Sequence, residues 1–116
     1  MSNLFDLTGK NALVTGSHKG LGASIAIAMA QAGANVALHG RSGESKPVMD
    51  AVRKTGSTAI SVTGDVANAK ACEEIVDATV HGLGSLDILV NNAGIIRRAP
   101  ASEYSEQDWN DVIDTL

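Results

Sequence analysis

The chain has 116 residues, enough for one domain with a modest core, and its 44% hydrophobic, 19% charged composition excludes a disordered chain. No apolar run approaches the roughly 18 residues of a membrane span, and the N-terminus lacks the features of a secretory signal. The formal net charge of −4 argues against nucleic acid as a partner, because binding to phosphates needs a basic face.

The cysteine and histidine residues argue against a disulfide and against a metal site. Cys72 is the only cysteine, so an internal disulfide is impossible, and we expect a buried thiol in a reducing, cytoplasmic compartment. His18, His39 and His81 lie far apart and lack metal-ligand spacing, which predicts no metal site.

Short β-branched runs alternate with longer helical patterns along the chain, which predicts parallel strands joined by helices. We expect strands at 12–15, 35–39, 58–62 and 86–90, helices at 21–32, 45–54 and 68–81, and a last helix that begins at Trp109 after its cap Ser105. The fold class is therefore α/β, a Rossmann-type doubly wound parallel sheet with strand order 3-2-1-4, of which residues 1–116 form an incomplete part.

The apolar spacing also predicts which helix faces meet the sheet. In the first helix the expected inner stripe is Leu21, Ile25, Ala28, Met29 and Ala32. In the helix at 68–81 the expected inner positions are Ala71, Ile75, Ala78 and Val80.

The most informative segment lies between the first strand and the first helix, where Gly16, Gly20 and Gly22 follow Thr15. A helix N-terminus offers unpaired amide donors and partial positive charge, and glycine lets a pyrophosphate approach the backbone. The alternative is a purely structural turn. Placement after a buried strand and before an amphipathic helix favours nucleotide binding.

The spacing G-x-x-x-G-x-G, together with Asn-Asn-Ala-Gly at 91–94 after the fourth strand, resembles the short-chain dehydrogenase/reductase family. The resemblance spans residues 5 to 116 and implies an NAD(P)-dependent oxidoreductase. It further implies a homo-oligomer, usually a tetramer, for the full-length protein.

The same resemblance implies the cofactor contacts. Asp65 would accept a hydrogen bond from the adenine amino group, while its alternative role is to stabilise a helix N-terminus. Whether Asn91 binds a ligand or ties the fourth strand to its neighbours stays open. The pyrophosphate would lie on Gly16, Ser17, His18, Lys19, Gly20, Leu21 and Gly22, adenine also on Val66, and the ribose and nicotinamide on Asn92, Ala93 and Gly94.

Cofactor choice is expected at the end of the second strand, where a carboxylate would favour NAD. The chain has Gly40 and then Arg41, whose guanidinium suits the 2′-phosphate of NADP, and Lys19 resembles the basic residue of NADP-using relatives. No acid competes at this point of the sequence. We therefore expect NADP(H) as the cofactor, with NAD(H) as the alternative. If neither side chain binds the cofactor, Arg41 and Lys19 are simply solvated cations on the surface.

Arg97 and Arg98, which follow the second motif, resemble the group of gluconate 5-dehydrogenase and 2-deoxy-D-gluconate 3-dehydrogenase. That group interconverts a secondary alcohol and a ketone on a sugar acid, whose carboxylate an arginine could bind. A solvated loop or a subunit contact is an equal alternative for both arginines. A 3-oxoacyl-thioester reductase, or a nucleotide-binding module without catalysis, is the competing function.

The family's catalytic Tyr-x-x-x-Lys and serine do not occur within residues 1–116. Tyr104 has Asp108 four residues later in place of lysine, so it is not the catalytic tyrosine. The family's asparagine falls seven residues after the helix tryptophan, a position that holds Leu116. We therefore expect these 116 residues alone to be inactive.

Overall fold

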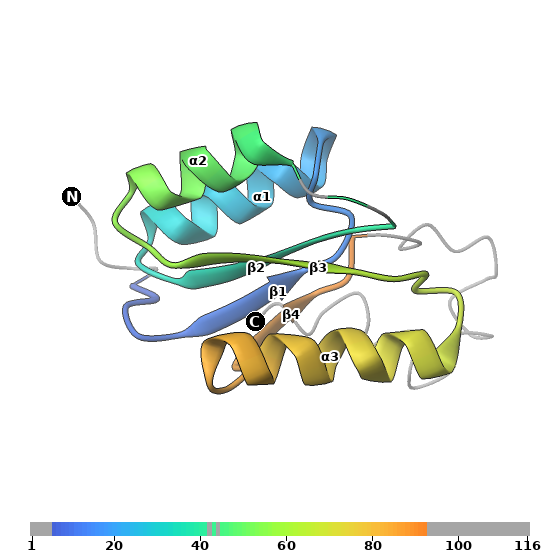
Figure 1. Ribbon diagram of the computed structural model, residues 1–116. Coiled ribbons are helices and arrows are strands. Elements are labelled where there is room, and N and C mark those ends of the chain that lie inside the picture. Colours follow the sequence, from blue (N-terminus) through green and yellow to red (C-terminus); the bar gives the residue numbers. More distant parts are fainter. Residues whose placement is uncertain (1–5, 42, 44, 93–116) are drawn as a thin grey trace, which may run out of the picture.

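The computed structural model describes residues 6–41, 43 and 45–92, and Figure 1 shows their arrangement. Strands and helices alternate along this part of the chain, as the sequence predicts. Boundaries agree with the prediction to within two residues. The elements are β1 (Asn11–Val14), α1 (Gly20–Gln31), β2 (Asn35–Gly40), α2 (Lys46–Lys54), β3 (Ala59–Thr63), α3 (Ala69–Leu83) and β4 (Ile88–Val90).

The four strands form one parallel sheet in the order β3-β2-β1-β4, which confirms the predicted topology. The register pairs Val14 with both Leu38 and Val90, and Leu38 with Ser61. Because the strands run in the same direction, their carboxyl ends meet at one edge of the sheet. The segments that follow β1, β2, β3 and β4 therefore lie side by side.

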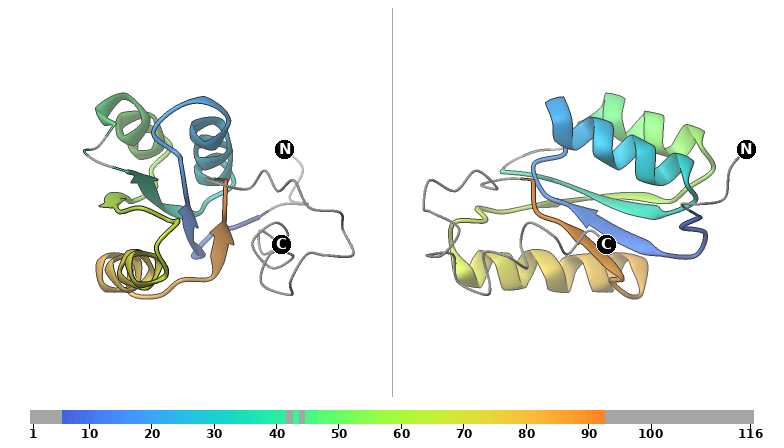
Figure 2. Two further views of the ribbon diagram at one scale, coloured as in Figure 1. Left: turned by 90° about the vertical axis from the view of Figure 1, so that its right-hand side faces the viewer. Right: turned by 180° about the vertical axis from the view of Figure 1, so that it is seen from behind.

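The sheet is the middle of three layers. Figures 1 and 2 show α1 and α2 on one face and α3 on the other. Alternate residues of β1 serve the two faces: Ala12 and Val14 pack toward α1 and α2, whereas Leu13 packs toward α3 with Ile75. These strands read as continuous apolar runs because both of their faces are buried.

The predicted inner stripe of α1 is right only in part. Ile25 and Met29 are half-buried and pack against the core, but they do not form the innermost row. The buried positions are Gly22, Ala23, Ala26 and Ala30, whereas Leu21 is 69% exposed. The helix is apolar on nearly every side, so hydrophobic spacing could not identify its inner face. Small side chains face the sheet because they let the helix backbone approach β1 and β2 closely.

The predicted inner face of α3 is right only in part. Ile75 is buried and Ala71 half-buried, but Ala78 and Val80 are exposed, and Thr79 is buried in their place. The Thr79 hydroxyl donates to the Ile75 carbonyl at 2.9 Å, which satisfies a polar group that the hydrophobic pattern did not identify as an inner position.

Three other expectations meet the structure with different outcomes. Cys72 is half-buried, not fully buried, and its thiol contacts the Val66 carbonyl at 2.9 Å. Among the described residues, no helix is long and apolar enough to cross a membrane. The predicted last helix with Ser105 and Trp109 lies outside the described residues.

Candidate functional site

A cleft of about 1500 Å³ opens along the carboxyl edge of the sheet and continues toward α3. Its polar wall comes from the segments that follow β1, β2 and β3, and its apolar wall comes from β1, β4 and α3. In open parallel sheets ligands bind outside the carboxyl ends of the strands, where neighbouring connections diverge to opposite faces. Here α1, which follows β1, and α3, which follows β3 and leads into β4, cover opposite faces of the sheet. The polar wall includes Gly16, His18, Lys19, Arg41, Asp65 and Val66.

The glycine loop, residues 16–22, requires glycine at some positions for backbone conformation and at another for lack of space. Gly16 and Gly20 have φ values of 62° and 61°, in the left-handed region that side chains disfavour. Gly22 is instead a close-contact position. A Cβ atom on Gly22 would overlap the carbonyl oxygen of Gly16 and lie 2.7 Å from Nδ2 of Asn92. The first turn of α1 is thereby held directly against the start of the loop.

Ser17 anchors this loop from beneath and is fully buried. Its hydroxyl donates to the Val14 carbonyl at 2.7 Å and accepts from the His39 N–H at 2.8 Å. Its own N–H donates to the His39 carbonyl at 2.8 Å. Ser17 therefore fixes the loop to β1 and β2 and has no surface in the cleft, although the sequence placed it among the ligand contacts.

The N-terminus of α1 is not neutralised by its own residues. Lys19 is the N-cap, with an extended backbone and no capping hydrogen bond from its side chain. The first turn contains no acidic residue. Since the first amides of a helix have no partner within it, Gly20, Leu21 and Gly22 present donors and partial positive charge beside the cleft.

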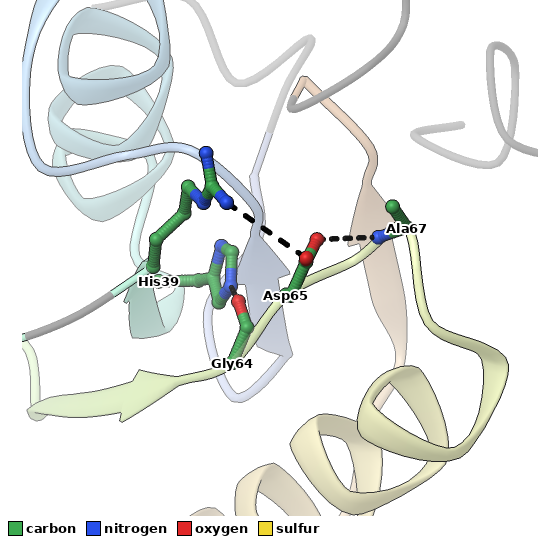
Figure 3. A network of polar contacts seen from close by, with 5 residues as sticks. His39, Gly64, Asp65 and Ala67 are labelled. Atoms are coloured by element: carbon green, nitrogen blue, oxygen red, sulfur yellow. Dashed lines mark hydrogen bonds and ion pairs between the residues drawn. The ribbon is translucent and has the colours of Figure 1, made fainter.

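An acid lies near Arg41, although the sequence at the end of the second strand predicted that no acid competes there. The carboxylate of Asp65, which follows β3, approaches the Arg41 guanidinium to 3.8 Å. Both side chains are largely exposed, at 83% and 53%. Asp65 also accepts a hydrogen bond from the Ala67 N–H at 2.9 Å, which fixes the turn before α3 (Figure 3).

The segment after β4 is tied to the glycine loop. The Thr15 hydroxyl donates to Asn91 Oδ1 at 2.9 Å, so Asn91 links β4 to β1. The Asn92 side-chain amide donates to the Gly16 carbonyl at 3.2 Å. The two motifs of the sequence thus touch each other, on neighbouring strands of the sheet.

His39 is a site residue that sequence reasoning missed. It is 1% exposed, and Figure 3 shows its ring directed at Gly64, whose carbonyl lies 2.7 Å from Nε2. Its Nδ1 accepts from the Gly16 N–H at 3.0 Å. A histidine that ends a buried strand was the available signal, because buried polar groups are nearly always hydrogen-bonded.

The structure thus gathers most of the predicted ligand residues at one place. Gly20, Leu21 and Gly22 lie in the adjoining first turn of α1, and Asn92 contacts the loop. The predicted ligand residues Ala93 and Gly94, and the predicted substrate residues Arg97 and Arg98, lie outside the described residues. Among the described residues no cluster of His, Cys, Asp and Glu could hold a metal ion.

Comparison with known proteins identifies relatives that match nearly the whole chain. Gluconate 5-dehydrogenase from Gluconobacter oxydans is 41% identical over 97% of the chain. A 3-oxoacyl-[acyl-carrier-protein] reductase from Staphylococcus aureus is 40% identical over 91% of the chain. The crystal structure of a short-chain type dehydrogenase/reductase from Mycobacterium marinum superposes with a TM-score of 0.75 at 35% identity, covering 99% of this chain and 48% of that one.

The chain spans about 44% of the length of these two curated relatives. A model of the family described as short chain dehydrogenase matches residues 10–115, which include the glycine loop, Arg41, Asp65 and the Asn-Asn-Ala-Gly motif. The chain belongs to the short-chain dehydrogenase family, whose members are oxidoreductases that bind an NAD(P) nucleotide.

Proposed function

We propose that the chain is the nucleotide-binding part of an NADP(H)-preferring oxidoreductase that interconverts a secondary alcohol and a ketone on a sugar acid. The nicotinamide, when bound, supplies the hydride chemistry. The described residues bind and orient the nucleotide. The observation that carries the proposal is that Arg41 and Lys19, the N-cap of α1, line one cleft.

The residues present fit such a cofactor. A Cβ atom on Gly20 would meet nothing within 4 Å, so open space adjoins the backbone at the start of α1. A pyrophosphate could approach those amides as it does in other dinucleotide-binding folds. Asp65 and Val66 lie on the same cleft, where the family resemblance puts the adenine.

The preference for NADP rests on Arg41 and Lys19. Arg41 directly follows the buried end of β2, where a carboxylate would be needed to bind both ribose hydroxyls of NAD. Its side chain is 83% exposed, so the guanidinium can turn toward a phosphate, which it would bind with paired donors.

The Asp65 carboxylate competes for the same guanidinium but weakly. An exposed ion pair contributes about 0.2–1 kcal/mol, and the separation of 3.8 Å is long for a hydrogen-bonded pair. A 2′-phosphate brings more charge and a better match to the guanidinium fork. We therefore propose that the site prefers NADP(H) to NAD(H), and that Asp65 reduces the difference in affinity between the two.

The substrate class rests on the resemblance of Arg97 and Arg98 to the gluconate 5-dehydrogenase group. The 41% identity to a gluconate 5-dehydrogenase supports it, yet 40% identity to a 3-oxoacyl reductase supports that alternative nearly as well. The homo-oligomer and the cytoplasmic location of the whole protein stay proposals, as does inactivity of these 116 residues alone.

The test is calorimetric titration of NADP and NAD into the wild-type chain and the variant Arg41→Ala. We expect tighter binding of NADP by the wild type. The variant should lose about tenfold in NADP affinity, the effect of one charged hydrogen bond of about 1.4 kcal/mol, and keep its NAD affinity.

Lys46→Ala is the matched control. Lys46 carries the same charge as Arg41 and is equally exposed, but it pairs with Asp50 along α2 and does not line the cleft. Equal or better NAD binding by the wild type would refute the NADP preference. A well-folded sample that binds neither nucleotide at millimolar concentration would refute the nucleotide site itself.

A further inference from the structure

The imidazole of His39 bridges the two halves of the polar wall. It accepts from the N–H of Gly16, the first residue of the glycine loop, and contacts the carbonyl of Gly64, the residue before Asp65. The loop after β1 and the turn after β3 have no strand pairing with each other, since β2 lies between them. His39, at the end of β2, connects them through its side chain.

These two contacts fix the protonation of the ring. A backbone N–H can only donate, so Nδ1 must be bare where it meets Gly16. A carbonyl can only accept, so Nε2 must carry the proton where it meets Gly64. Only the neutral ring with hydrogen on Nε2 satisfies both contacts, and it uses both ring nitrogens.

The backbone of His39 strengthens the hold on the loop. Its N–H donates to the Ser17 hydroxyl and its carbonyl accepts from the Ser17 N–H, each at 2.8 Å. Together with the bond from Nδ1, three hydrogen bonds join one residue of β2 to the first two residues of the loop. The Gly16 carbonyl, in turn, faces Gly22 and accepts from Asn92.

We propose that His39 is a positioning residue for nucleotide binding, which rests on the function proposed above. Its ring acts through Gly16, whose placement sets where the first turn of α1 presents its amides. Through its contact with the Gly64 carbonyl, the ring also holds in place the turn that carries Asp65. His39 does this from a buried place in the wall of the cleft, with 1% of its surface exposed.

Two substitutions separate the contacts of the ring. Asparagine places its amide oxygen near the position of Nδ1 and can still accept from Gly16, but it is too short to reach Gly64. Glutamine places its amide nitrogen near the position of Nε2 and can still donate to Gly64, but it leaves the Gly16 N–H without its acceptor. Each variant loses one of the two side-chain contacts, so their stabilities should fall by similar amounts.

The measurements are NADP affinity by calorimetry, urea unfolding, and hydrogen exchange of the Gly16 amide in the complete chain. We expect H39N to bind NADP within about threefold of wild type and H39Q about tenfold more weakly, a difference near one buried hydrogen bond. Exchange at Gly16 should accelerate in H39Q and stay slow in H39N.

Losses of affinity that are equal in the two variants and follow their stability would overturn the positioning role. A wild-type chain that binds neither NADP nor NAD would instead refute the proposed function. Nitrogen NMR of the wild-type His39 ring requires no variant to fold. A bare Nδ1 and a protonated Nε2 support the bridge, and a proton on Nδ1 overturns it.

Discussion

Gly22→Ala should destabilise the chain although alanine is the better helix former. In the first turn of α1 the new methyl group would overlap the Gly16 carbonyl oxygen and lie 2.7 Å from Asn92 Nδ2. Both obstacles are held in place, the first by backbone and the second by its hydrogen bond to that carbonyl. The helix start and the loop must therefore move apart.

The magnitude follows from three contributions. Overpacking a close contact costs about 1–3 kcal/mol. Losing the bond from Asn92 to Gly16 costs about 1 kcal/mol more. Replacing glycine by alanine in a helix returns at most about 1 kcal/mol. We expect a net loss of roughly 1–3 kcal/mol in the free energy of unfolding.

Gly82→Ala is the matched control. Gly82 lies in α3, and a Cβ atom there would meet only the outer end of the Ile60 side chain, with Cδ1 at 2.6 Å. That end can rotate away, so the stability should stay equal to wild type or rise by up to about 1 kcal/mol. Urea unfolding followed by circular dichroism gives both values as shifts of the midpoint at constant slope. A Gly22→Ala variant as stable as Gly82→Ala, with nucleotide affinity unchanged, would refute the close-approach role of Gly22.

Two further predictions concern polar contacts outside the cleft. Asn68→Ala should lower the free energy of unfolding by about 1 kcal/mol, because its side chain caps α3 by accepting from the Lys70 and Ala71 amides; unchanged urea stability would contradict this. The hydroxyl and then the N–H of Thr8 lower the pKa of the Asp6 carboxyl. The stabilisation is therefore present above the unfolded-state pKa and lost as the pH falls through the lower folded-state value. In Thr8→Ala an NMR titration should show the Asp6 pKa moving up toward its ordinary value, and an unmoved pKa would contradict the hydroxyl's role.

The sequence predicts the architecture of this chain well because its strands are buried on both faces. A continuous apolar run such as Ala12 to Val14 is readable without knowing its neighbours. Glycines then mark turns with a strong conformational requirement, as at Gly16 and Gly20. Strand order followed from the short connections and their handedness, and the structure has the same order.

The orientation of α1 was not predictable in the same way. Hydrophobic spacing identifies an inner face only where another face is polar, and α1 has Leu21 exposed at 69% beside buried alanines. What selects the face is the size of the side chains. Alanine and glycine at 22, 23, 26 and 30 permit the closest approach of helix to sheet.

Contacts between different strand ends were also beyond sequence reasoning. Arg41 and Asp65 are far apart in sequence, and only the parallel sheet brings the two positions together. The bridge from His39 to Gly16 and Gly64 has the same origin, because it spans three adjacent strand ends. Such pairs depend on register and on side-chain direction, which no local pattern specifies.

These contacts distinguish two parts of the glycine loop: Gly16 and Ser17, which are bonded to His39, and the residues that begin α1. The amides of Gly16 and Ser17 are used within the protein, by the ring and carbonyl of His39. They are therefore not the donors that a pyrophosphate would meet. Those donors remain at the first turn of α1, behind Lys19, where the helix has neither an acid nor a capping side chain of its own. Attachment of the first part to His39 keeps the second part at a fixed place beside the cleft, and the proposed function therefore predicts that nucleotide affinity depends on these buried contacts.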